Sequence, residues 1–495
     1  MKISFIFTPF CAPTFVPYYL CELIGYLYAR GLDADCSIFD WNIEQFQRSL
    51  GDLAEVKRIK SGDWSSYLDD SYRVAHQWQR IQEKTELELE AYLRRAGSVP
   101  SIFAMVDEEI EFSEFVCLSL TFNHRGGASQ FYPTIALAKY IKNKWPEKKI
   151  ILGGAYLNHI GREQLIKIFT EIDFVLYRES EESLFLLLNE TETNKQLIPN
   201  MVFRDKGNII TTEQVDNVQR QLDYVPIFEG IEFDKYLSPE TSVAIQYKRG
   251  CDWGKCTFCS QNNTYFLKPE VNQQGFTKRV EALKKEGVKF LFLADQMISP
   301  KDLAFINSVL GDSFFWACMM MPQKGISGQL LEEMYASGCR WICWGIESGS
   351  KGVLKSMNKP MDIEVAKANI INASQSGIKN VLLMIDGFPT ETEEDRKQSL
   401  DFLKEMKPYY YDNSLSPFHV CQGSYVQNNP AEFGIEKLSR VPIYKDDEKI
   451  LYSELYSYSP MKNIEVNNED RRTIPYAEHM LIACTLYSDL AVLEL

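Results

Sequence analysis

The 495-residue sequence lacks any apolar run that approaches the roughly 20 residues needed to cross a membrane. Its first residues, "MKISFIFTPFCAP", also lack the basic start, the long apolar centre and the small-residue cleavage site of a secretory signal. We therefore expect a cytoplasmic protein that has no membrane partner.

Positive charge is scarce as well, because 53 Lys and Arg residues stand against 68 Asp and Glu residues, which gives a formal net charge of −15. General binding of nucleic acid requires a basic surface that offsets the phosphate charge. The composition therefore argues against a nucleic-acid partner, and the acidic balance mainly favours solubility.

Twelve cysteines are present, but nine of them are scattered singly along the chain. A free cysteine is a common small core residue, so we interpret these nine as core residues. The other three, Cys251, Cys256 and Cys259, lie together in the stretch "RGCDWGKCTFC". In a reducing compartment such a group is more often metal-binding or catalytic than disulfide-bonded.

Residues 1–195 alternate between short apolar strands and amphipathic helices, beginning with a strand at 2–8 and a helix at 19–30. This alternation predicts a parallel sheet with helices on both faces, that is, a doubly wound, Rossmann-like domain. A charged, amphipathic segment at about 42–112 is nearly free of Gly and Pro, and we expect a helical insert there. Residues 196–240 are predicted to form a hairpin and a linker.

A second alternation runs from residue 241 to about residue 424. It contains six strand–helix units, fewer than the eight of a closed barrel. We therefore predict an open, partial (β/α)6 barrel, followed by a mixed C-terminal domain at 425–495 that ends in a helix. The fold class is α/β.

The three clustered cysteines lie at the carboxyl end of the first predicted barrel strand, where α/β barrels carry their chemistry. Three thiolates suit a zinc site that takes a fourth ligand, or a 4Fe–4S cluster with one iron left open. No His or Cys follows at zinc-finger spacing, which disfavours a closed structural zinc. Gly250 and Gly254 allow a tight turn, and Lys255 adds positive charge that favours thiolates.

The stretch "CDWGKCTFC" resembles the cluster-binding loop of the radical S-adenosylmethionine (SAM) superfamily. Its spacing of four residues and then two is longer than the family's commonest spacing of three and then two. The flanking "RGC" and the internal "WG" resemble the branch that modifies ribosomally made peptides. The resemblance implies a 4Fe–4S cluster on Cys251, Cys256 and Cys259, SAM on the open iron, and Phe258 near the adenine.

Three later stretches resemble other parts of this family. "LFLAD" ends at Asp295, where the family presents groups to the methionine amino group, although this chain has Ala-Asp instead of paired glycines and Glu. "WGIESGS" resembles a fourth-strand segment that contacts SAM, with Glu347 and Ser348 as the polar groups. "GFPTETEED", at 387–395, resembles the turn after the fifth strand. Each stretch alone also fits an ordinary helix cap or turn.

The N-terminal domain resembles the cobalamin-binding domain that precedes the barrel in one branch of the superfamily. The matching positions are Ser119 and Thr121 at one strand end, and Gly153 and Gly154 at another. The family's Gly-Glu-Gly-Glu stretch is Arg-Glu-Ser-Glu at 178–181, so both glycines are lost. A larger side chain there would crowd a backbone that lies against a corrin.

The resemblance as a whole implies an enzyme with a 4Fe–4S cluster, SAM and cobalamin that takes electrons from an external donor such as flavodoxin or ferredoxin. It implies a 5′-deoxyadenosyl radical and methylation of an unactivated carbon in a peptide or small natural-product substrate. Three alternatives stay open. The first is a vestigial cobalamin domain with epimerisation, cross-linking or transfer of another SAM group; the second is a cluster that only transfers electrons; the third is a non-catalytic, zinc-stabilised binding module.

Overall fold

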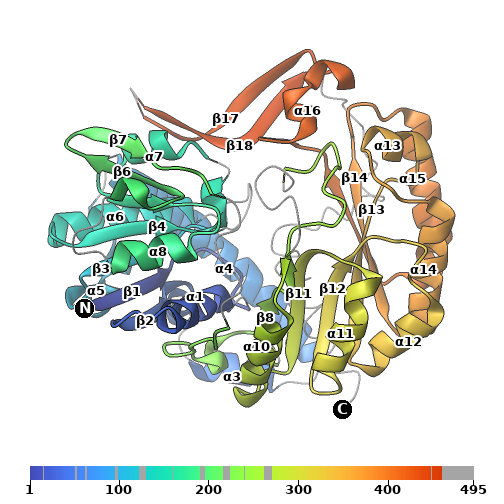
Figure 1. Cartoon of the computed structure of the whole chain (residues 1–495), viewed down its shortest axis with the longest axis horizontal. Helices are drawn as coiled ribbons and strands as arrows, with labels where there is room; N and C mark the ends of the chain where they lie inside the picture. Colours follow the sequence, from blue (N-terminus) through green and yellow to red (C-terminus); the bar gives the residue numbers. More distant parts are fainter. Residues whose placement is uncertain are drawn as a thin grey trace. The chain divides into compact units, whose positions relative to one another are not determined.

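The computed structural model describes residues 1–14, 16–50, 53–61, 64–94, 98–121, 130–158, 160–189, 195–215, 223–238, 240–260, 270–446 and 449–459. These residues divide into two compact units (Figure 1). The first unit consists mainly of Met1–Ser242 and includes Pro442–Tyr452, and the second consists mainly of Val243–Val441. Among the described helices, none is both long enough and apolar enough to cross a bilayer.

The first unit is built on a seven-stranded sheet in the order β2-β1-β3-β4-β5-β6-β7. Strands β1 to β5 pair in parallel, and β6 and β7 complete the sheet in antiparallel fashion. The strands are β1 (Lys2–Phe7), β2 (Asp35–Asp40), β3 (Phe115–Ser119), β4 (Lys149–Gly153), β5 (Phe174–Leu176), β6 (Met201–Asp205) and β7 (Asn208–Thr211). The parallel part has the flavodoxin-like order 2-1-3-4-5, which creates a ligand-binding switch point between β1 and β3.

Helices cover this sheet and supply the predicted insert. They are α1 (Tyr18–Ala29), α2 (Trp41–Leu50), α3 (Leu53–Lys60), α4 (Trp64–Leu93), α5 (Asp107–Glu111), α6 (Phe131–Lys144), α7 (Arg162–Ile168) and α8 (Glu181–Leu188), with 3-10 turns η1 (Ser101–Met105), η2 (Ala155–Asn158), η3 (Lys195–Leu197) and η4 (Phe233–Lys235). The insert is helical as predicted, and its long helix α4 packs against α6. The inner strands β1 and β3 are buried almost throughout, as expected for a sheet covered on both faces.

The second unit is built on a six-stranded sheet in the order β15-β14-β13-β12-β11-β8. The strands are β8 (Ser242–Ile245), β11 (Phe290–Ile298), β12 (Phe315–Met320), β13 (Cys339–Glu347), β14 (Lys379–Asp386) and β15 (Asp412–Pro417). Neighbouring strands from β11 to β15 are parallel, and the chain visits them in sequence. Because β8 and β15 stand at opposite ends of this order, the barrel is open and partial, which confirms the prediction.

The barrel helices lie along the outer side of the sheet in Figure 1. They are α10 (Gln273–Lys285), α11 (Pro300–Leu310), α12 (Gly328–Ala336), α13 (Lys351–Ser356), α14 (Ile363–Gln375) and α15 (Glu393–Met406), followed by the 3-10 turn η5 (Lys407–Tyr409). Two of them begin with a capping box, Ser299 with Asp302 on α11 and Thr392 with Asp395 on α15. Such reciprocal hydrogen bonds satisfy the free N–H groups of a helix start and fix where each helix leaves its loop.

Two smaller sheets complete the described chain. The pair β9 (Lys248–Arg249) and β10 (Glu270–Val271) is antiparallel and encloses the cysteine stretch. A C-terminal antiparallel sheet has the order β16-β18-β17, with β16 (Val420–Cys421), α16 (Tyr425–Asn428), η6 (Pro430–Phe433), β17 (Lys437–Lys445) and β18 (Ile450–Ser459). The helix predicted at the C-terminus lies outside the described residues.

Candidate functional site

The cysteine loop, defined as residues 250–260, follows directly after β9 at the carboxyl end of the first barrel strand. Gly250 and Gly254 have φ angles of 99° and 60°, in the left-handed region that glycine adopts most readily. Cys259 donates its N–H to the carbonyl of Cys256 at 3.2 Å, which closes a turn between two of the thiols. All three cysteines of the loop are partly exposed.

The three thiols lie close enough to influence one another. Burial, with smaller contributions from the neighbouring Cys259 and Cys251, raises the pKa of Cys256 to about 12, while Lys359 opposes the rise. Among the described residues, no three Cys, His, Asp or Glu side chains converge closely enough to hold a single metal ion. A 4Fe–4S cluster places each cysteine on a different iron, so the donor set of three neighbouring thiols suits a cluster better than one zinc ion.

The outer side of the loop is fastened to the end of α13. Thr257 donates its N–H to the carbonyl of Met357 at 2.9 Å. Trp253 donates its indole N–H to the carbonyl of Asn358 at 2.8 Å, and the Asn358 amide donates to the carbonyl of Lys255 at 2.8 Å. Trp253 through its side chain, and Lys255 and Thr257 through their backbones, therefore hold the loop against the end of α13.

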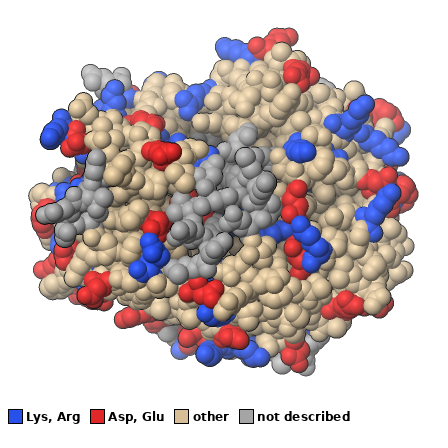
Figure 2. Space-filling view, viewed as in Figure 1, with Lys and Arg blue, Asp and Glu red and all other residues tan. Residues whose placement is uncertain are grey.

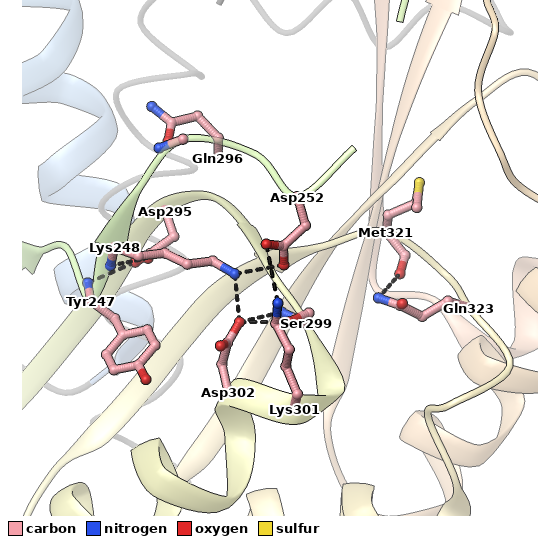
Figure 3. A network of polar contacts seen from close by, with 11 residues as sticks. Tyr247, Lys248, Asp252, Asp295, Gln296, Ser299, Lys301, Asp302, Met321 and Gln323 are labelled. Carbon is pink, nitrogen blue, oxygen red and sulfur yellow. Dashed lines mark hydrogen bonds and ion pairs between the residues drawn. The ribbon is translucent and has the colours of Figure 1, made fainter. Parts of the chain in front are cut away.

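The base of the loop is held by the end of β11 (Figure 3). The carboxylate of Asp295 accepts the backbone N–H groups of Tyr247 and Lys248 at 3.0 and 2.7 Å. The side-chain oxygen of Gln296 accepts the N–H of Gly250 at 2.7 Å. These three bonds fix the backbone immediately before the first cysteine.

A buried ion cluster lies beside these bonds, as Figure 3 shows. The ammonium of Lys248 lies 2.5 Å from a carboxylate oxygen of Asp302 and 2.8 Å from one of Asp252. The Lys248 side chain is 1% exposed, so its charge is desolvated and depends on these two partners. Ser299 donates its hydroxyl to Asp302 at 2.6 Å within the capping box of α11, so the Lys248–Asp302 pair links the strand before the loop to the start of this helix.

The four residues that the sequence assigns to SAM occupy different environments. Asp295 is fully buried, and burial raises its pKa to about 7 although the two backbone N–H groups favour the charged form. Its oxygens contact the loop backbone, so the described contacts give it a positioning role. Phe258 packs beside a hydrophobic cluster that includes Val353, Met357 and Phe388.

Glu347 is the assigned residue with the most unusual backbone, since its φ angle is 64° at the end of β13. Its carboxylate lies 2.6 Å from the ammonium of Lys359, and the two side chains are 14% and 8% exposed. Left-handed backbone at a residue other than Gly costs energy and gathers at functional sites. The electrostatic effect of Lys359 on Cys256 places this pair beside the cysteine loop.

Ser348 follows Glu347 but is completely buried. Its hydroxyl oxygen lies 3.1 Å from that of Ser399 and accepts the N–H of Ser350 at 3.1 Å. Through these contacts the Ser348 side chain connects the turn after β13 to α15.

The turn at 387–395 is also held internally. Gly387 has a φ angle of 78° and donates its N–H to the carboxylate of Glu391 at 2.7 Å. Burial raises the pKa of Glu391 to about 7. Asp386 pairs with Arg396 at 3.0 Å, so this stretch forms an ordered turn that leads into α15.

In the first unit, the assigned hydroxyls gather at the switch point. The phenol of Tyr19 contacts the hydroxyl of Ser119 and lies 3.0 Å from that of Thr121, and the latter two lie 2.9 Å apart. Gly153 ends the neighbouring strand β4, and no atom lies within 4 Å of the position that a Cβ would take there. Gly154 has a φ angle of 116°, and a Cβ there would collide with the backbone of Leu120. Open space beside a glycine suits the approach of a broad, flat ligand.

In the Arg-Glu-Ser-Glu stretch, Arg178 stands where the family has a glycine and keeps a glycine-like backbone conformation. Arg178 has a φ angle of 56°, the left-handed conformation typical of glycine. Its N–H donates to the side-chain oxygen of Asn158 at 2.7 Å, which supports this conformation. The backbone therefore follows a glycine-like path at Arg178 despite the larger side chain.

Several residues of the site were not singled out from the sequence. Asp302 lies in the sequence "SPKD", which is typical of a capping box, but that pattern predicts only the start of a helix and not a site residue. No sequence pattern marked Lys248 or Lys359, since only folding brings their partners Asp302 and Glu347 close to them. Tyr19 stood out only as an aromatic residue of a predicted helix.

Comparison with known proteins finds a family model that matches part of the chain. Residues 245–403 match the model of the Radical SAM superfamily. Among curated sequences, the chain is 22% identical over 355 residues to the tRNA-2-methylthio-N(6)-dimethylallyladenosine synthase of Clostridium botulinum, covering 68% of this chain and 72% of the relative. The corresponding Clostridium tetani synthase is 24% identical over 303 residues, covering 58% of this chain and 61% of the relative.

Two solved structures share the fold over most of the chain. The radical SAM methyltransferase TsrM from Kitasatospora setae, with tryptophan and a SAM analogue bound, gives a TM-score of 0.66 at 12% identity and covers 98% of this chain and 95% of that one. The cobalamin-dependent radical SAM enzyme OxsB, with aqua-cobalamin bound, gives 0.65 at 13% identity and covers 92% of this chain and 64% of that one. At these identities the likeness shows a common fold.

Proposed function

From the premise that residues 245–403 form a radical SAM domain, we propose that the chain is a cobalamin-dependent methyltransferase that acts on a carbon atom of a peptide or small natural product. The radical SAM domain implies a 4Fe–4S cluster and SAM. The observation that carries the proposal is the fold shared with TsrM over 98% of the chain, at both the Rossmann-like unit and the partial barrel.

The residues of the cysteine loop fit a cluster. Cys251, Cys256 and Cys259 would hold three irons and leave the fourth for SAM. When bound, the three cofactors supply the one-electron and methyl-transfer chemistry, while the protein supplies placement and exclusion of water. The contacts of Asp295 and Lys248 would keep the base of the loop fixed when the cluster and SAM are bound.

Glu347 is the residue that we propose for contact with the polar end of SAM. It lies at the carboxyl end of a barrel strand, where such enzymes place their functional groups. Its salt bridge to Lys359 fixes the carboxylate, so the group is preorganised rather than recruited on binding.

The switch point of the first unit is the proposed cobalamin site. Ser119 and Thr121 offer hydroxyls there, and Gly153 borders open space. The structures of TsrM and OxsB that share this fold were solved with cobalamin. The glycine-like backbone conformation of Arg178 is compatible with cobalamin binding at the carboxyl ends of the strands of this sheet.

The test is the spectrum of protein purified without oxygen, reconstituted with iron and sulfide, and supplied with cobalamin. One corrin per chain after desalting, beside about four irons, would support the methyltransferase. Iron without retained corrin would reject the methylation proposal and leave the radical SAM chemistry in place, with epimerisation or cross-linking as the next activities to assay.

A pair of glycine variants makes this test specific. Gly153→Leu fills the open space at the switch point, and Gly328→Leu adds the same side chain at an equally open glycine of the barrel unit. We expect the first variant to lose at least tenfold in corrin retention with its iron content unchanged, and the second to behave as the wild type. Equal retention in both would remove Gly153 from the proposed site.

Transfer of a methylthio group to tRNA is the second candidate, favoured by the Clostridium relatives. The net charge of −15 disfavours it, because tRNA binding relies on neutralising phosphates. Incubation of the reconstituted enzyme with bulk tRNA, followed by mass analysis of the nucleosides, separates the two. A methylthio adduct would replace the first proposal.

A further inference from the structure

A hollow of about 430 Å³ adjoins the outer side of the cysteine loop. Trp253 of the loop lines it, together with Lys351, Lys355 and Lys359 of α13 and the turn that follows. A fourth lysine, Lys255, holds its ammonium 5.3 Å from the centre of the Trp253 ring. We call these five residues the lysine hollow.

Acidic side chains near the lysine hollow are already engaged. Asp362 also lines it, but its carboxylate caps α14 by accepting the N–H groups of Glu364 and Val365. Glu347 is paired with Lys359. Lys351 and Lys355 are exposed, and within the described part of the chain neither forms an ion pair. The four lysines outnumber the two carboxylates, Asp362 and Glu347, so the hollow carries a net positive charge.

This local charge contrasts with the chain as a whole, whose net charge is −15. Figure 2 shows Lys and Arg side chains over the region where Figure 1 draws α13 and α15, with acidic side chains between them. A basic hollow on an acidic protein attracts an acidic partner to one place and repels it elsewhere, which selects both partner and orientation.

The lysine hollow includes two residues of the cysteine loop, so it lies next to the proposed cluster ligands in the sequence. Trp253 and Lys255 lie between Cys251 and Cys256 in the loop itself. Asn358 joins both of them to the end of α13 through two hydrogen bonds of 2.8 Å. A molecule bound at the hollow would therefore contact the loop that carries the three thiols, which gives an electron a short path to a cluster bound there.

Building on the proposed function, we propose that the lysine hollow is the docking surface for the electron donor, an acidic one-electron carrier protein. The donor is oxidised by one electron, the cluster is reduced by one electron, and no atom or proton is transferred. RNA is the other polyanion that a basic surface can attract, but the four lysines of the hollow are few for contacts along a phosphate backbone on a chain of this net charge.

The experiment compares two reductants on the reconstituted holoenzyme, with bleaching of the cluster absorbance followed by stopped flow. One reductant is a reduced flavodoxin, which is an acidic protein, and the other is dithionite, which needs no docking surface. The test variant is Lys351→Glu with Lys355→Glu. The control is Lys285→Glu with Lys289→Glu, an identical charge change on exposed lysines before β11, at the opposite end of the barrel.

We expect the test variant to slow reduction by flavodoxin at least tenfold at low salt, with the difference shrinking at high salt. Reduction by dithionite and the iron content should match the wild type, and the control variant should behave as the wild type with both reductants. Equal flavodoxin rates in all three proteins would overturn the proposal. So would a parallel loss with dithionite, which would assign the lysines to the cluster itself.

Binding of labelled tRNA provides a further arm. If the test variant lost tRNA binding while keeping the flavodoxin rate, the hollow would be an RNA surface and the proposal would be wrong. Failure of the proposed function looks different from each of these results, because then the enzyme would retain no corrin and transfer no methyl group, while the rates of cluster reduction by the two reductants would not change.

Discussion

The ammonium of Lys248 lies 2.5 Å from a carboxylate oxygen of Asp302, and the two side chains are only 1% and 8% exposed. Lys248 belongs to β9 and precedes the cysteine loop, while Asp302 lies in the first turn of α11. A charge buried this deeply is costly when it loses a partner. The pair therefore ties the stability of the barrel to the geometry of the loop.

Asp302→Asn should lower the free energy of unfolding by about 3 kcal/mol, because it leaves the buried Lys248 with Asp252 as its remaining carboxylate. Denaturant titration of the apoprotein, followed by tryptophan fluorescence, measures the change. The control is Lys301→Met, since Lys301 is 70% exposed and its contact with Asp252 is 3.3 Å, so the expected loss is below about 0.5 kcal/mol. Equal losses in the two variants would contradict the argument.

Asp295 should make stability depend on pH. Burial, with a smaller contribution from Asp302, raises its folded-state pKa to about 7 from the ordinary 3.8, while hydrogen bonds from the Lys248 and Tyr247 backbones and the charge of Lys248 oppose the rise. A carboxyl group whose folded pKa is raised contributes stability that is present below about pH 4 and is lost as the pH rises through 7. The free energy of unfolding of the wild type, relative to that of Asp295→Asn, should therefore fall by on the order of 4 kcal/mol as the pH rises from 4 to 7.

The measurement is the unfolding midpoint in urea at several pH values, for both proteins. Asn keeps the volume of Asp295 but replaces one of its two acceptor oxygens with an NH2 group. The cost of this lost hydrogen bond does not vary with pH, so the change of the stability difference with pH reports ionisation. Parallel pH profiles would mean that Asp295 does not titrate in this range.

The alternating apolar pattern predicted both sheets and nearly every element, because strands and helices differ in period. Periodicity carries no information on lateral order, so the 2-1-3-4-5 arrangement of the first sheet had to come from the structure. The open barrel was predictable from the number of strand–helix units alone.

The site was predictable only where a local motif carried it. The cysteine loop and its two glycines were recognised, but the Lys248–Asp302 pair joins residues 54 positions apart. For Ser348 a local motif was present but did not decide its role, since a polar Glu-Ser-Gly-Ser stretch suits a ligand contact and a buried turn equally well. Its burial follows from the packing of Gly349 against Gln398 and Ser399 of α15, which no local pattern encodes.

Cysteine variants separate the cluster ligands from the core thiols. Cys256→Ala should reduce the iron content after reconstitution from about four per chain to near zero, because a cluster needs three protein thiolates. Cys339→Ala should retain the full iron content, since Cys339 is completely buried next to Cys318 in the barrel core. Iron and sulfide analysis checks both. Iron lost from the second variant and kept in the first would move the cluster to the core.

Glu347→Gln tests the proposed SAM contact without removing a side chain. A hydrogen bond to a charged group contributes about 1.5–3 kcal/mol, so the loss of the charge should weaken SAM binding roughly tenfold or more. Equilibrium dialysis of labelled SAM against reconstituted enzyme measures this, with Glu364→Gln on the exposed start of α14 as the control. Unchanged affinity together with a lower melting temperature would reduce Glu347 to a structural partner of Lys359. Weaker binding with unchanged iron content would instead support a contact between Glu347 and SAM.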